Sequence, residues 1–287
     1  MNQMNIRVKR STAVLATVLL TAAAAGPVLS RSDARPFAGE RHLTAGDEAL
    51  ALRHMPLRER RDLEPLFEDD SNLIVGYTRR VMEIKQLPDG SLRAEQLGIL
   101  NREGEPLDIP SLEQAAFRDT DTPGTTLYQS LTVYRTCSTC LQWNIRHYYD
   151  WQGTPIGGNN GNRDRIGVAW GGNLALKTGS YHMTGAYTNG SSITPFDQFV
   201  DAEDGVGWSF REWYSPNPPL SHIYANWGRG YASIVESKFQ NRLTNVVAGY
   251  AHTGLSTTGG SISFGPASIS FSGTDDFEWK FSVQITT

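Results

Sequence analysis

The sequence predicts a mainly β protein: an antiparallel β-sandwich of Greek-key-like connectivity, preceded by a small α+β N-terminal segment. Past residue 126, apolar side chains recur at every second position, and clusters of Gly, Asn, Ser and Pro separate the apolar stretches. No long helical pattern lies between these stretches. All seven Trp residues also lie past residue 126, and large aromatic side chains build cores. We therefore expect residues 126–287 to form the sandwich.

The first thirty residues have the layout of a secretory signal peptide. A basic stretch, Arg7 to Arg10, precedes an apolar run from Ser11 to Ala25, and charge returns at Arg31. The apolar run is shorter than the about 20 residues that span a bilayer. We expect residues 1–30 to be cleaved and the protein to be secreted into the extracellular space. Cleavage after Ala25 and an uncleaved anchor are the alternatives.

Residues 31–125 form a charged α+β segment that ends in a linker. They hold 13 basic and 19 acidic residues, against 10 and 11 in residues 126–287. The turn residues Pro88-Asp89-Gly90 predict a β-hairpin between residues 81–86 and 91–96. We also expect helices over residues 44–55 and 57–67, and a linker over 103–124 with one helical turn at 112–117. The segment could serve as a cap, a pro-segment or a spacer.

The strands of the sandwich follow from period-2 alternation. We expect them over residues 127–136, 141–151, 165–176, 180–187, 206–214, 222–227, 231–237, 245–252, 261–264, 268–272 and 277–285. The last strand is the clearest, because five apolar residues alternate with Glu278, Lys280, Ser282 and Gln284. Such alternation indicates one buried face and one solvated face.

Charge restricts the partners. The whole chain carries a formal net charge of -4, and residues 31–287 carry about -7. A nucleic-acid-binding protein normally presents a basic face, so nucleic acid is excluded as a partner. An anionic membrane surface is disfavoured for the same electrostatic reason. The sequence gives no indication of the oligomeric state.

Cys137 and Cys140 are the only cysteines. One Cys-x-x-Cys pair supplies too few ligands for a structural zinc site, and no helix of a βαβ unit follows it. Because an exported protein meets an oxidising environment, we expect a disulfide across a turn. Redox and metal-binding roles remain alternatives.

The sequence contains no recognisable catalytic, cofactor or metal motif. No His pair has metal-ligand spacing, and no Gly-x-Ser-x-Gly elbow is present. We expect His147 to be a core or rim residue, and the acidic groups Asp201 to Asp204 and Asp275-Asp276 to be turn residues. Asn159 to Asp164 is rich in oxygen donors and is a candidate calcium site, although it lacks the acidic spacing of an EF-hand. A long hairpin loop is favoured there.

Residues 253–272 are rich in Gly, Ser and Thr. Ile262 and Phe264, and then Ile269 and Phe271, alternate with serines on either side of Gly265-Pro266. This pattern predicts a hairpin with one apolar and one hydroxyl face. The apolar face either packs on the core of a soluble domain, which we favour, or inserts into a membrane.

Aromatic residues offer candidates for ligand binding. Sugar rings stack on exposed aromatic side chains, and amphipathic rings suit recognition surfaces. We take Trp143, Trp151 and Trp213 as the candidates, with core packing as the alternative for each.

Part of the chain resembles a set of uncharacterised secreted proteins of Gram-positive bacteria. The similar residues are an aromatic strand, Tyr148-Tyr149-Asp150-Trp151, and the segment Asp164-Arg165-Ile166-Gly167-Val168-Ala169-Trp170. The Gly- and Ser-rich stretch from Gly260 to Ser272 is also similar. The resemblance implies export and a β-rich fold, and it implies no activity and no site residues.

Three functional hypotheses follow. We favour a secreted, non-enzymatic binding module for a surface glycan or envelope polymer, because the sandwich is poor in charge and rich in Trp. The alternatives are a pore-forming or membrane-acting protein that uses the hairpin 253–272, and a secreted hydrolase.

Overall fold

The computed structural model describes residues 57–68, 72–86, 92–100, 124–137, 139–153, 155, 163–217, 222–237, 240–252, 261–272 and 277–287. The predicted signal peptide, the helix expected over 44–55, the helical turn at 112–117 and the acidic pair Asp275-Asp276 lie outside these residues. Most of the Asn159–Asp164 loop lies outside them too.

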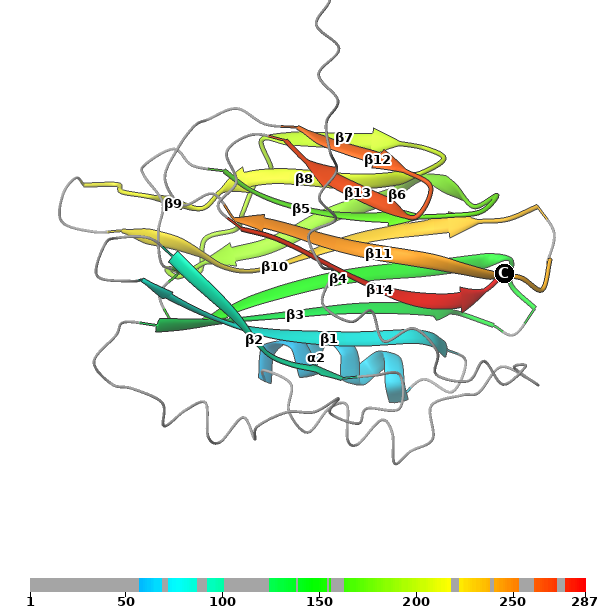
Figure 1. Ribbon diagram of the computed structural model, residues 1–287, viewed down its shortest axis with the longest axis horizontal. Coiled ribbons are helices and arrows are strands. Elements are labelled where there is room, and N and C mark those ends of the chain that lie inside the picture. The colour runs from blue at the N-terminus through cyan, green and yellow to red at the C-terminus, as the bar shows by residue number, and fades with distance from the viewer. Residues whose placement is uncertain are drawn as a thin grey trace, which may run out of the picture. The chain divides into compact units, whose positions relative to one another are not determined.

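The described chain is almost entirely strand, as expected (Figure 1). The elements are α2 (Leu57–Glu68), β1 (Leu73–Gln86), β2 (Leu92–Leu100), β3 (Gly124–Arg135), β4 (Gln142–Gln152), β5 (Arg163–Trp170), β6 (Ala175–Tyr187), β7 (Asp197–Asp201), β8 (Gly205–Arg211), β9 (Trp213–Tyr214), β10 (Ile223–Val235), β11 (Leu243–His252), β12 (Ile262–Gly265), β13 (Ser268–Phe271) and β14 (Phe277–Thr286). Helix α2 confirms the helix predicted over 57–67. No described helix is long and apolar enough to cross a membrane.

Two antiparallel sheets form the sandwich. One has the order β2-β1-β3-β4-β10-β6 with β9 paired to β10, and the other has the order β14-β11-β5-β8-β7. The neighbours β4 and β10, and β11 and β5, are far apart in sequence, so the chain crosses repeatedly between the sheets. The predicted antiparallel sandwich is therefore confirmed.

An aromatic core fills the space between the sheets. Tyr149 of β4 stacks on Phe210 of β8, with ring centroids 5.4 Å apart and planes 10° apart. Trp208 of β8 lies so close to Gly230 of β10 that a Cβ at that glycine would meet the indole at 2.6 Å. Trp143, Trp170 and Trp208 have no exposed surface. The alternating apolar residues past position 126 thus form the interior that the sequence predicts.

The predicted division of the chain at residue 125 needs correction. The hairpin expected around Pro88-Asp89-Gly90 exists, because Gln86 pairs with Leu92. However, β1 also pairs along its length with β3, from Leu73 opposite Arg135 to Lys85 opposite Gly124. The N-terminal hairpin therefore belongs to the seven-stranded sheet. The inward residues of β1 extend the core, which a composition shift along the sequence cannot reveal.

Two strand predictions also differ from the structure. Residues 222–227 and 231–237 form one strand, β10, because Gly228 and Gly230 sit inside it and make room for Tyr149 and Trp208. The short edge strand β7 was not expected, since its five residues are mostly exposed and show no alternation.

A second layer covers the outer face of each sheet. Helix α2 packs Leu63 against Ile74, Tyr77 and Tyr134 on the outside of the seven-stranded sheet. The hairpin of β12 and β13 packs Ile262 and Ile269 against Ala169 on the outside of the five-stranded sheet.

Candidate functional site

Three ring side chains that reach the surface gather where β9 meets the start of β10. We call Trp213, His222 and Tyr224 the aromatic patch. Tyr214, the next residue of β9, points to the opposite side and packs its ring on Tyr187 at 5.1 Å. Pairing of Trp213 with Tyr224, and of Tyr214 with Ile223, holds the two strands together. The Trp213 ring lies 4.4 Å from the His222 ring and 6.2 Å from the Tyr224 ring, measured between centroids. His222 is exposed, and Trp213 and Tyr224 are half-buried.

A tyrosine hydroxyl and an imidazole provide the polar groups of the aromatic patch. The Tyr214 side chain instead holds the neighbouring turn, because its hydroxyl accepts from Asn189 Nδ2 at 3.3 Å and lies 3.3 Å from the Ser191 hydroxyl. The Tyr224 hydroxyl lies 3.3 Å from Nδ1 of His222. Burial, and then the nearby charge of Glu212, raise the pKa of Tyr224, so its hydroxyl stays protonated at neutral pH. The patch therefore combines flat apolar faces with neutral hydrogen-bonding groups.

The structure separates the three Trp candidates. Trp213 is half-buried and lies in the aromatic patch. Trp143 and Trp151 are 0% and 2% exposed, which corrects their assignment as ligand-binding residues. Both belong to the inward row of β4 and face the other sheet. Trp151 Nε1 donates to the Tyr250 hydroxyl over 3.1 Å, so its polar edge is also satisfied inside the core.

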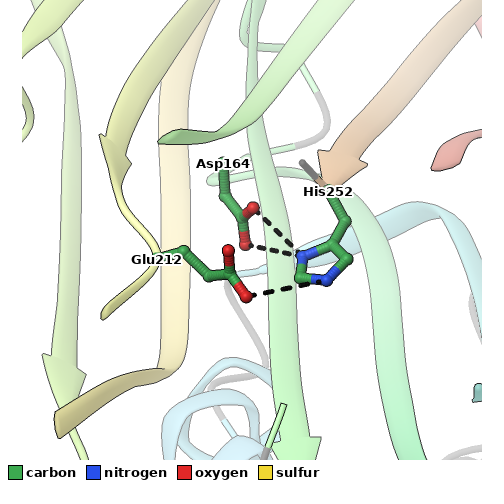
Figure 2. Close-up of side chains that lie close together, drawn as sticks. All are labelled: Asp164, Glu212 and His252. Carbon is green, nitrogen blue, oxygen red and sulfur yellow. Dashed lines mark hydrogen bonds and ion pairs between the residues drawn. The ribbon is translucent and has the colours of Figure 1, made fainter. Parts of the chain in front are cut away.

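A second cluster lies inside the sandwich, where the start of β5 meets the ends of β8 and β11. We call Asp164, Glu212 and His252 the buried trio, because each is 0% exposed. Asp164 lies at the start of β5, Glu212 follows β8, and His252 ends β11. Figure 2 shows the three side chains pointing toward one another.

The imidazole of His252 lies between the two carboxylates. Its Nδ1 is 3.1 Å from Asp164 Oδ1 and 3.3 Å from Oδ2, and its Nε2 is 3.7 Å from Glu212 Oε1 (Figure 2). One ligand atom from each residue can be chosen so that all three lie within 4.8 Å of one another. A His and two carboxylates at this spacing can hold a metal ion or share protons.

A hydrogen-bonded chain supports the buried trio. Tyr250 donates its hydroxyl proton to Asp164 Oδ2 and accepts from Trp151 Nε1. Burial, and then the charge of Asp164, raise the pKa of Tyr250 well above its usual value, so this hydroxyl acts as a neutral donor. The Trp151 ring also packs against the His252 ring at 5.2 Å. The imidazole and Asp164 are thus fixed in place by the aromatic core.

The inward rows of the strands contain a sequence signal for the buried trio. Asp164 stands two residues before Ile166, Glu212 two after Phe210, and His252 two after Tyr250, so each continues an inward apolar row. A charged residue in such a row is costly unless it finds a partner. The sequence does not show that β8, β5 and β11 are neighbours, which is what brings the three together.

The four apolar residues proposed for a membrane hairpin pack inside the fold. Ile262 and Ile269 are buried, and Phe264 and Phe271 are partly buried against the same cluster. Their apolar face therefore lies on the outer face of the five-stranded sheet.

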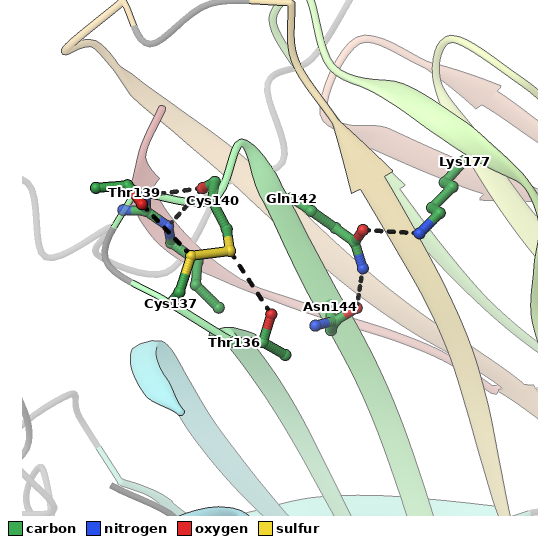
Figure 3. Close-up of a disulfide and its surroundings, with 8 residues drawn as sticks. Thr136, Cys137, Thr139, Cys140, Gln142, Asn144 and Lys177 are labelled. Atoms are coloured by element: carbon green, nitrogen blue, oxygen red, sulfur yellow. Dashed lines mark hydrogen bonds between the residues drawn. A yellow bond between two sulfur atoms is a disulfide. The ribbon is translucent and has the colours of Figure 1, made fainter. Parts of the chain in front are cut away.

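The disulfide between Cys137 and Cys140 is present (Figure 3). Its Cα atoms lie 5.3 Å apart, and it closes the turn between β3 and β4. The Arg135 guanidinium donates to the Cys140 carbonyl through Nε at 3.0 Å and Nη2 at 2.8 Å. These contacts indicate a structural link in a turn.

Two other predictions concern polar loops. Of the candidate calcium loop, Asp164 is described, and it belongs to the buried trio. Asp201 Oδ1 accepts from the backbone N–H groups of Glu203 and Asp204, at 3.0 and 3.2 Å. These acidic residues therefore cap a turn, as expected.

Comparisons with known proteins identify no family. The chain matches no protein-family model and no curated protein. Among solved structures, it is similar to the collagen-binding domain of a Staphylococcus aureus adhesin, at 6% identity and a TM-score of 0.29, over 48% of this chain and 86% of that domain. It is also similar to a collagen adhesin from S. aureus, at 6% identity and a TM-score of 0.28, over 62% of this chain and 75% of that one. A likeness this weak supports no statement about ligand or activity.

Proposed function

We propose that this chain is an extracellular binding protein whose aromatic patch binds the sugar rings of a surface glycan. The observation that carries the proposal is the gathering of three rings at the surface between β9 and β10, with the Tyr224 hydroxyl and the His222 imidazole at their margin. Pyranose rings present an apolar C–H face and a rim of hydroxyls. The aromatic patch offers the complement of both.

The charge of the patch favours a neutral ligand. Its polar groups are the Tyr224 hydroxyl and the His222 imidazole, which lie 3.3 Å apart. Glu212, the nearest acidic residue in the chain to Trp213, is fully buried. A neutral polysaccharide would therefore bind without desolvating a carboxylate of the patch, whereas a polyanion would find a cationic partner there only when His222 is protonated.

The disulfide supports an extracellular location. A disulfide forms and persists in oxidising compartments, and the predicted signal peptide would deliver the chain to one. Because the apolar face of the β12–β13 hairpin is buried on the five-stranded sheet, the structure gives the membrane-acting alternative no additional support.

The first test is a binding assay with a panel of insoluble and soluble neutral polysaccharides. We expect the protein to bind at least one of them, and we expect Trp213→Ala to weaken that binding by about 10-fold, equivalent to about 1.4 kcal/mol. Pull-down followed by isothermal titration calorimetry with oligosaccharides measures the change.

A matched control is Phe196→Ala. Phe196 is 48% exposed but lies outside the aromatic patch, against the guanidinium groups of Arg163 and Arg211. It should leave the affinity unchanged. Failure of the wild type to bind any glycan, or equal binding by Trp213→Ala, would remove the proposal.

A further inference from the structure

The buried trio concentrates negative charge inside the sandwich. Asp164 and Glu212 are both fully buried, and His252, even when protonated, brings one positive charge against two carboxylates. Burying an ionised carboxylate is costly unless it is paired, hydrogen-bonded or bound to a metal. A bound cation would be one such partner for the two acidic groups.

The spacing of the three side chains suits ligands of one ion. Bonds from a zinc-type ion to nitrogen or carboxylate oxygen are about 2.0–2.2 Å long, so the ligand atoms of a tetrahedral ion lie about 3.3–3.6 Å apart. The distance from His252 Nδ1 to Asp164 Oδ2, 3.3 Å, falls in that range, and the distance to Oδ1, 3.1 Å, is slightly shorter. The widest separation within the three ligand atoms is at most 4.8 Å, so the Glu212 carboxylate would move toward the ion on binding.

We propose that Asp164, Glu212 and His252 bind one divalent transition-metal ion of the Zn²⁺ class, through one oxygen of each carboxylate and one imidazole nitrogen. This proposal rests on the buried trio alone and is independent of glycan binding.

The donor set selects the class of ion. Imidazole nitrogen suits Zn²⁺ and its transition-metal neighbours, whereas Ca²⁺ and Mg²⁺ prefer oxygen ligands alone and usually six or more of them. One nitrogen and two carboxylate oxygens leave at least one further position of a tetrahedral ion for water. We therefore expect Zn²⁺ to bind much more tightly than Ca²⁺, contrary to the calcium site considered at Asn159–Asp164.

Neighbouring groups would orient the ligands. Metal-binding residues are typically held by further hydrogen bonds, and loss of such a partner costs 10–100-fold in metal affinity. The Tyr250 hydroxyl donates to Asp164 and is itself held by Trp151 Nε1. Tyr250→Phe, which removes only that hydroxyl, should therefore weaken Zn²⁺ binding by roughly 10-fold or more.

The decisive experiment uses the full secreted chain, stripped with a chelator and titrated with ZnCl₂ by calorimetry, with CaCl₂ in parallel. We expect one Zn²⁺ per chain, a melting temperature that rises by several degrees with Zn²⁺, and little response to Ca²⁺. Substitution of Co²⁺ should give the visible absorption spectrum of a site with nitrogen and oxygen ligands, which reports the ligand set without any variant.

Variants assign the ligands. Glu212→Gln and His252→Gln should each abolish stoichiometric Zn²⁺ binding. The matched controls are Glu236→Gln and His147→Gln, because Glu236 and His147 are also buried but lie outside the trio, and both should bind Zn²⁺ as the wild type does. Trp213→Ala should also keep one Zn²⁺ per chain, which separates this proposal from the glycan proposal.

Two results would overturn the proposal. One is a wild-type chain that takes up no stoichiometric Zn²⁺ or Co²⁺, which would mean that the buried trio is a proton-sharing network. The other is undiminished binding in folded Glu212→Gln and His252→Gln variants, which would place the ion elsewhere.

Discussion

Individual buried titratable residues make the stability of this protein depend on pH. His147 is 0% exposed and packs edge-on against Phe281, with ring centroids 5.6 Å apart. Burial lowers the pKa of His147 to about 3. The Gly167 backbone acts in the opposite direction, but its effect is smaller. The native chain therefore keeps this imidazole neutral under conditions in which the unfolded chain protonates it.

The pKa of His147 predicts acid destabilisation with a defined sign. Because the folded pKa lies below the unfolded value of 6.5, the stability is present above about pH 6.5 and is lost as the pH falls toward 3. At about 1.4 kcal/mol for each pH unit, the loss between pH 6.5 and pH 4 is up to about 3 kcal/mol. Urea unfolding across this range should show a shallower slope for His147→Gln; an identical slope would contradict the assignment.

Asp150 provides a control of opposite sign. Burial raises the pKa of Asp150 to about 6, against the lowering effect of hydrogen bonds from Tyr148 and Gln152 and the charge of Arg58. Its contribution to stability is present below about pH 4 and is lost as the pH rises through 6. In Asp150→Asn, the free energy of unfolding should therefore fall more steeply as the pH is lowered from 6 to 4. In His147→Gln, it should fall less steeply.

At this scale, the sequence identifies buried rows better than it identifies sites. His147 was predicted as a core or rim residue, and alternation placed it correctly on the inward row of β4. Trp143 and Trp151 lie on the same row, so the alternation that identified the strand also implied their burial. The aromatic patch depends on the pairing of Trp213 with Tyr224, which spacing along the chain does not reveal.

Among the elements, the β12–β13 hairpin shows how glycines position an outer layer. Gly249 of β11 faces this hairpin, and a Cβ there would meet Phe271 at 2.8 Å and Ile269 at 3.0 Å. Similar approaches occur at Gly167 and Gly207, where the nearest hairpin atoms belong to Ile269 and Ile262. The glycines thus leave the outer face of the five-stranded sheet flat enough to seat the hairpin.

Gly249→Ala should displace the hairpin from the outer face of the five-stranded sheet. The added methyl group has to displace Phe271 and Ile269, and overpacking of this kind costs about 1–3 kcal/mol. The double variant Gly249→Ala/Phe271→Leu has a smaller side chain opposite the new methyl group. It should recover part of the lost free energy of unfolding. Ser263→Ala, on the exposed face of the hairpin, should stay within about 0.5 kcal/mol of the wild type. Urea denaturation measures these free energies of unfolding. A Gly249→Ala variant as stable as the wild type would disprove the role of Gly249 in positioning the hairpin.

The alternation of Ile262, Phe264, Ile269 and Phe271 predicted the hairpin but not its location. Alternation defines two faces of a strand, yet it does not identify the surface that one face covers. The glycines that form that surface come from β5, β8 and β11, far away in the sequence. Likewise, the predicted break inside β10 was wrong because Gly228 and Gly230 serve packing there and form no turn.

At the scale of the whole described chain, the two candidate sites share one strand connection. Glu212 of the buried trio and Trp213 of the aromatic patch are consecutive residues, with the first side chain inside the sandwich and the second at its margin. The Glu212 carbonyl accepts from the Ala225 backbone N–H at 2.6 Å, which ties this connection to β10. A change at either residue therefore needs the other site measured as a control.

The fold class followed from the sequence because alternation and aromatic content extend over most of the sandwich. The placement of residues 73–100 in the same sheet did not follow, because their charged composition differs from that of the later strands. Strand pairing between β1 and β3 unites the two regions, and pairing between distant strands is what composition and periodicity leave undetermined.

Selective oxidation of tryptophan in the native protein, located by mass spectrometry, tests the central claim that two sheets enclose an aromatic interior and leave Trp213 at the surface. We predict that Trp213 and Trp227, which are half-buried, react first. The five buried residues, Trp143, Trp151, Trp170, Trp208 and Trp279, should react only after unfolding. Rapid oxidation of Trp143 or Trp151 in the folded protein, or protection of Trp213, would contradict the account.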